Sequence, residues 1–191
     1  YVRTARRLLQ ERAVAGSDMT AARTGLQAAF RDAPDEPRRL RALWAPNAIG
    51  ALDETALFGL LAHADESVRG WAVRLLVDRT PVAPGVVAKL AEQAKGEESP
   101  RARLALTSAL QRIAPADRRP LAEVLATADI DPADPMLPLM TWYGIEPLAA
   151  SEFDRAAALI PTVKLPMLRN FLARRMVAAD PSKGLGALAP V

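Results

Sequence analysis

The residues in this chain that could support catalysis or metal binding are few. His63 is the only histidine, and the sequence contains no cysteine. A metal site at His63 would depend on neighbouring carboxylates such as Asp65 and Glu66, whereas structural metal sites use several nitrogen or sulfur ligands. A single histidine near the end of a helix is more typical of a side chain that caps carbonyl groups. We therefore predict no catalytic residue, no metal ligand and no bound cofactor in this chain.

The aromatic segment "LPLMTWYGIEPL" is the second candidate site. It contains Trp142, Tyr143 and Glu146. Tryptophan and tyrosine are frequent anchors of protein interfaces, so these residues could form an exposed interaction patch. Alternatively, the two rings fill space between helices, with Pro138 and Pro147 setting the turns. A ligand-binding enzyme would instead need a deep pocket with converging polar groups beside Trp142.

Basic residues gather in the first segment of the chain and again around residues 38–41, although the net charge is only +3. A basic face that contacts phosphate groups is one interpretation, and it makes a nucleic-acid-binding helical protein the alternative function. Processing of a flipped base would also need a pocket with a carboxylate and aromatic side chains, which no spacing here specifies. A solvated surface explains the clusters more simply, so we expect no nucleic-acid partner.

Apolar residues recur at spacings of three and four, in blocks separated by proline, glycine and aspartate, which indicates helices rather than strands. The spacing predicts helices over residues 1–14, 18–31, 38–50, 53–62, 66–78, 83–95, 100–113, 117–127, 136–149, 152–160 and 165–179. Asp53, Asp65 and Ser99 are expected N-cap residues. No apolar run is long enough to span a membrane. We expect a helical domain over residues 1–180, cut from a longer polypeptide, and a frayed or truncated tail over residues 181–191.

An arginine recurs near the start of successive helical blocks. In "VRGWAVRLL" Arg69 follows Val68, and apolar residues lie two, three, six and seven positions further on. The corresponding arginines are Arg3, Arg41, Arg69, Arg103 and Arg169. In stacked helical hairpins, an arginine at the junction can bury its stem and donate to carbonyl or carboxylate groups of the adjacent turn. The repetition predicts an all-α, right-handed α-solenoid with these arginines at the junctions; an irregular helical bundle is the alternative.

The block around Arg69 resembles the short bacterial HEAT repeat, an armadillo-type helical hairpin whose second helix reads D-x-x-V-R-x-x-A-x-x-x-L. The matching residues are Asp65, Val68, Arg69, Ala72 and Leu76. The other blocks match less closely.

Three longer segments are similar to the helical-repeat region of large planctomycete proteins described as membrane-bound dehydrogenases or cytochrome c domain-containing proteins. They are "YVRTARRLLQER", "RLRALWAPNAIGALDE" and the stretch over residues 101–149. In those exported, periplasmic proteins the region lies between a β-propeller and a C-terminal cytochrome c domain. The resemblance implies that haem belongs elsewhere in the parent protein, because this chain lacks the cysteines of a C-x-x-C-H motif. It also implies a non-catalytic scaffold that contacts neighbouring domains or another protein.

Overall fold

The computed structural model describes residues 1–190, and every regular element in that range is helical. The elements are α1 (Val2–Val14), α2 (Thr20–Arg31), α3 (Glu36–Ala48), α4 (Glu54–Leu60), α5 (Glu66–Val77), α6 (Pro84–Gly96), α7 (Pro100–Ala109), a 3-10 turn (Pro115–Asp117), α8 (Arg119–Thr127), α9 (Leu137–Ser151), α10 (Phe153–Leu159), α11 (Pro166–Ala179) and α12 (Pro181–Leu188). The all-α prediction is confirmed. Within residues 1–190, no helix has both the length and the apolar character needed to cross a membrane.

Several helices begin at a polar side chain that accepts a hydrogen bond from the first turn. Asp53 accepts from the N–H of Ala56 at 2.8 Å, and Asp65 accepts from the N–H of Ser67 at 2.9 Å. Ser99 accepts from Ala102 at the start of α7. The first N–H groups of a helix have no partner inside the helix, so these side chains supply one. The three predicted caps are confirmed.

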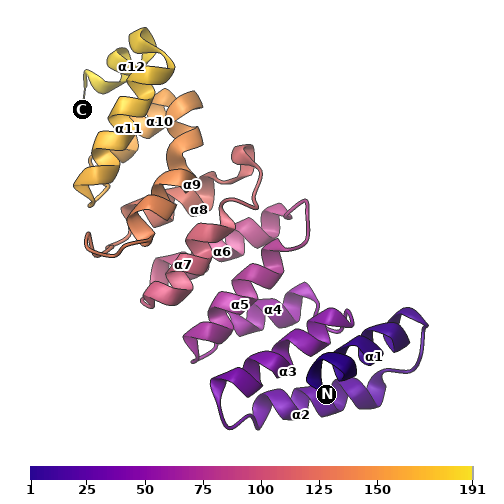
Figure 1. Ribbon diagram of the computed structural model, residues 1–191. Helices are drawn as coiled ribbons and strands as arrows, with labels where there is room; N and C mark the ends of the chain where they lie inside the picture. Colours follow the sequence, from indigo (N-terminus) through magenta and orange to yellow (C-terminus); the bar gives the residue numbers. More distant parts are fainter. Residues whose placement is uncertain (191) are drawn as a thin grey trace.

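The odd-numbered helices from α3 to α11 form a row in which each helix contacts the next. The contacts run from α3 to α5, from α5 to α7, from α7 to α9 and from α9 to α11. Among the even-numbered helices, α6 packs on α8 and α10 packs on α12. Figure 1 shows the helices following one another along the molecule, with the two ends of the chain at opposite ends.

The hydrophobic core is continuous along the row of odd-numbered helices. Val68 in α5, Leu106 in α7, Ile145 in α9 and Leu172 in α11 are fully buried and belong to one cluster. Each helix therefore buries its apolar side against its neighbours in the row. At the N-terminal end, α1 and α2 contain no buried residue.

The C-terminal segment differs from the frayed tail expected over residues 181–191. Residues 181–188 form α12, and Asp180 caps the helix by accepting from the N–H of Lys183 at 3.0 Å. Helix α12 packs on α11, and Gly184 of α12 is buried. The last residue of the expected tail, Val191, lies outside the described residues. The sequence of residues 181–188 is only weakly apolar and did not predict a helix. The helix packs on α11, and this contact is not visible in the sequence.

Candidate functional site

Four arginine side chains make the same main-chain contact in four different helices. Arg39, Arg69, Arg103 and Arg169 are each the fourth residue of their helix. Each donates to the carbonyl oxygen six residues earlier, in the turn that precedes its helix. The acceptors are Ala33, His63, Glu97 and Val163, at 3.2, 2.9, 2.6 and 2.6 Å. Each arginine thereby joins the second helix of a hairpin to the turn that leads into it.

In the second block the structure corrects the predicted junction residue from Arg41 to Arg39. The Arg39 guanidinium is partly buried and donates to Ala33 O and to Asp65 at 2.7 Å, whereas Arg41 is exposed. The segment "PRRLR" offers three arginines close together, and the start of α3 at Glu36 decides which of them reaches the turn. Arg3, the predicted junction residue of the first block, is exposed on α1 and is the second residue of its helix.

This correction predicts a difference between two neighbouring substitutions. Arg39→Ala should lower the free energy of unfolding by about 1–3 kcal/mol, because Asp65 and a turn carbonyl lose their donors. Arg41→Ala should change it by less than about 0.5 kcal/mol, as is usual for exposed sites. Urea denaturation of both variants measures the two values. Equal effects of the two substitutions would contradict the assignment of the junction to Arg39 rather than Arg41.

Three of these arginines also reach forward to the next turn along the row. Arg39 binds Asp65, Arg69 binds Glu97, and Arg103 donates to the carbonyl oxygen of Asp129 at 2.5 Å. The partners are 26 or 28 residues apart in sequence. Each guanidinium thus bridges the turn of its own hairpin and the turn of the following one. The sequence does not indicate these acceptors, because a main-chain carbonyl has no residue signature and the two carboxylates lie at different sequence distances from the next arginine.

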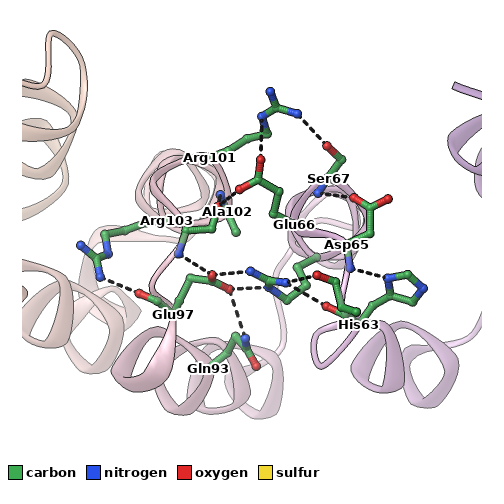
Figure 2. A network of polar contacts seen from close by, with 12 residues as sticks. His63, Asp65, Glu66, Ser67, Gln93, Glu97, Arg101, Ala102 and Arg103 are labelled. Carbon is green, nitrogen blue, oxygen red and sulfur yellow. Dashed lines mark hydrogen bonds and ion pairs between the residues drawn. The ribbon is translucent and has the colours of Figure 1, made fainter. Parts of the chain in front are cut away.

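The most buried ion pair in the row joins Arg69 of α5 to Glu97 in the turn before α7. The Nε and Nη2 atoms of Arg69 donate to the two carboxylate oxygens at 2.8 and 2.7 Å, and only 2% of the Glu97 side chain is exposed. The N–H of Ser99 and the amide of Gln93 also donate to Glu97, at 2.9 and 3.3 Å. Figure 2 shows this carboxylate at the centre of a network that spans two hairpins.

The charge state of the two acceptor carboxylates follows from their partners. Burial raises the pKa of Glu97, but the hydrogen bonds from Arg69 and from the Ser99 N–H outweigh it, so the pKa lies below the usual glutamate value. Burial likewise raises the pKa of Asp65, and the bonds from Arg39 and the Ser67 N–H reverse the shift. Both side chains are therefore anionic at neutral pH, and their contacts with Arg39 and Arg69 are ion pairs.

The predicted patch of Trp142, Tyr143 and Glu146 is divided by the structure. The Trp142 ring is half-buried and tilted against Phe171 of α11, with 5.2 Å between ring centroids. Glu146 forms an ion pair with Arg175 of α11. Only Tyr143 is largely exposed, at 55%. Two of the three residues therefore join α9 to α11. In α9 the fourth residue is Met140, whereas α3, α5, α7 and α11 have an arginine at that position.

His63 lies in the turn between α4 and α5. Its Nδ1 accepts from the N–H of Asp65 at 3.0 Å, and its ring lies 5.7 Å from that of Phe30. These contacts stabilise the turn into which Arg69 donates. In residues 1–190, no group of three or more histidine, cysteine, aspartate or glutamate side chains is arranged to hold a metal ion.

Three open grooves lie beside the odd-numbered helices. The α5–α7 groove, lined by Trp71, Arg74, Ala105 and Arg112 among others, has a volume of about 310 Å³. The α9–α11 groove is lined by Trp142, Phe171, Arg174, Arg175 and Ala178 and has a volume of about 300 Å³. The α1–α3 groove, about 360 Å³, is lined mainly by aliphatic side chains, including Leu26 and Ala29 of α2, together with Arg6, Arg38 and Arg41. None of these grooves was predicted from the sequence, because each combines residues of different helices.

Comparison with known proteins adds no relative: no protein-family model, no curated protein and no solved structure matches this chain.

Proposed function

We propose that this chain is a right-handed α-solenoid of HEAT-like helical hairpins that serves as a non-catalytic scaffold for another protein or a neighbouring domain. The observation that carries the proposal is the repeated arginine contact. The same residue type, at the same place in four helices, binds the same carbonyl position, and three of the four also bind the next turn. Repeat proteins are built from such nearest-neighbour contacts, whereas a bundle around one centre gives no reason for them to recur.

The use of the polar residues supports a scaffold rather than an enzyme. The most buried carboxylate, Glu97, is held by Arg69, Ser99 and Gln93, so its hydrogen-bonding capacity is spent between hairpins. The grooves, in contrast, are open to solvent and lie along the row of odd-numbered helices. An extended surface of this kind suits a partner that is itself extended or broad. The resemblance to exported redox proteins would make a β-propeller or a cytochrome c domain of the parent polypeptide the neighbour.

Site-specific photo-cross-linking in cells that make the natural protein tests this function. The cross-linking amino acid p-benzoylphenylalanine replaces Ser108, which lines the α5–α7 groove, and in a control replaces Lys89, an exposed residue of α6. We expect an adduct at Ser108 that mass spectrometry maps to one defined polypeptide stretch, and no such adduct at Lys89. Equal labelling at the two positions, or no polypeptide adduct at Ser108, would contradict the scaffold function.

A further inference from the structure

We propose that the face carrying the three grooves binds an extended acidic polypeptide segment, with apolar side chains of that segment seated in the grooves and carboxylates bound by the arginines around them. This inference rests on the proposed scaffold function and names the chemistry of its partner.

The α5–α7 and α9–α11 grooves occupy equivalent places on the odd-numbered helices. Counting from the junction arginine of each helix, Trp71, Ala105 and Phe171 are two residues further on, and Arg74, Ser108 and Arg174 are five residues further on. These positions line the α5–α7 and α9–α11 grooves. In α3 the position two residues after Arg39 is Arg41, which lines the α1–α3 groove. The repeat therefore places the α5–α7 and α9–α11 grooves on one face of the row, and the α1–α3 groove shares the Arg41 position with them.

The charge on this face is strongly one-sided. Seven arginines line the three grooves, and Asp78 is the one carboxylate among the lining residues. The arginines are Arg6, Arg38, Arg41, Arg74, Arg112, Arg174 and Arg175. The whole chain has a net charge of only +3, and two other grooves of the molecule carry acidic and basic side chains in similar number. A local excess of positive charge attracts an anionic partner and guides its approach.

Two of these guanidinium groups, in Arg74 and Arg174, are available to a partner. Arg112 lies 3.7 Å from Asp78, Arg38 lies 3.6 Å from Asp35, and Arg175 is paired with Glu146. Arg74 and Arg174 are exposed, and within the described residues neither forms an ion pair. A planar guanidinium binds a carboxylate through two parallel hydrogen bonds, which makes arginine well suited to this recognition.

The aromatic rings favour a polypeptide over a single-stranded nucleic acid. Single-strand binding uses ring faces on which bases stack. Here the Arg74 guanidinium covers the Trp71 ring at 5.0 Å from its centroid, the Trp44 ring meets the same ring at 4.7 Å, and Trp142 is tilted on Phe171. The rings therefore serve as apolar walls. Separate grooves with such walls fit individual side chains better than a continuous phosphate backbone.

The row also defines a spacing for the partner. The α5–α7 and α9–α11 grooves are two helices apart, and packed helices are separated by about 8–10 Å, so the grooves lie about 16–20 Å apart. An extended chain advances about 3.3 Å per residue, so about five or six residues connect the two grooves. The matching segment carries an apolar residue flanked by carboxylates and repeats that arrangement about six residues later.

Fluorescence anisotropy with a labelled synthetic peptide and the full chain tests the inference. The probe has two Asp-Phe-Asp triplets whose phenylalanines are six residues apart, within a glycine-serine sequence. We expect binding to this probe, and at least tenfold weaker binding to a matched peptide whose phenylalanines are three residues apart, because only one groove is then filled.

Substitutions locate the site. Arg74→Gln and Arg174→Gln should each weaken binding of the six-residue probe about tenfold, the effect of losing one charged hydrogen bond. Lys89→Gln, outside the face, should change the affinity by less than about twofold, since a distant exposed charge is screened. Circular dichroism confirms that each variant is folded, and Arg174, which is exposed and does not cover a ring, keeps the test valid if Arg74→Gln unfolds.

Two results would overturn the inference. If neither peptide binds while the cross-linking experiment succeeds, the scaffold function stands and the acidic partner is wrong. If a 20-nucleotide single-stranded DNA binds more tightly than the six-residue probe and loses affinity steeply with added salt, the face binds nucleic acid instead.

Discussion

Replacing Glu97 by alanine should lower the free energy of unfolding by about 3–5 kcal/mol, the usual cost of removing one partner of a buried ion pair. The substitution leaves the Arg69 guanidinium without a counter-charge at a junction where its side chain is only 17% exposed. It also removes the acceptor of the Ser99 N–H at the start of α7. Both losses fall between two hairpins, so they weaken the contact between α5 and α7.

Urea denaturation measures this effect, and the chain offers a matched control. Glu92 lies in α6 and pairs with Lys95 at 2.7 Å, but both side chains are more than half exposed. Glu92→Ala should therefore change stability by less than about 0.5 kcal/mol. The double variant Arg69→Ala/Glu97→Ala should lose less than the sum of the two single variants, because they share one interaction. Additive losses would show that the two side chains act independently.

The same ion pair has a pH signature. The pKa of Glu97 is lower in the folded protein than its usual value, so its contribution to stability is present at neutral pH and is lost as the pH falls through the folded-state pKa. The stability advantage of the wild type over Glu97→Gln should therefore shrink below about pH 4, the usual range of a glutamate pKa. Chemical denaturation at pH 7 and pH 3 provides the comparison. An advantage that is constant with pH would mean that the charge of Glu97 contributes nothing.

Gly184→Ala should destabilise the docking of α12 on α11 by about 1–3 kcal/mol, the range typical of overpacked sites. A Cβ atom at residue 184 would lie 2.7 Å from the carbonyl carbon and oxygen of Met176 and 2.8 Å from the nitrogen of Val177. These are main-chain atoms of α11, so no side-chain rotation relieves the overlap. The helix propensity of alanine offsets at most about 1 kcal/mol of this cost.

Hydrogen exchange of the α12 amides and trypsin cleavage after Lys183 report the undocking, and both should become faster. Gly186 supplies the control, because it lies in the same helix and a Cβ there meets nothing within 4 Å. Gly186→Ala should slow both processes through its higher helix propensity, worth about 1 kcal/mol. Unchanged exchange in Gly184→Ala would mean that the two helices do not approach closely.

The sequence by itself determined the helices up to residue 179, most of their starting points and the place of Arg69 at a junction. These features depend on interactions within a few residues: the spacing of apolar side chains, and a side chain such as Asp53 or Ser99 that binds the N–H groups of the next turn. Arg69 was recognisable for the same reason, because its position relative to Val68 and the following apolar residues is local.

Only the tertiary structure decided which arginine of "PRRLR" belongs to the junction, what each arginine binds and whether the chain end folds. Arg39 and Arg41 lie two residues apart on either side of Leu40, and only Arg39 reaches the turn carbonyl at Ala33. Helix α12 depends on a close approach to Met176 that glycine permits. The grooves likewise combine helices about thirty residues apart. Such contacts join distant segments through main-chain atoms and shape, neither of which a residue pattern encodes.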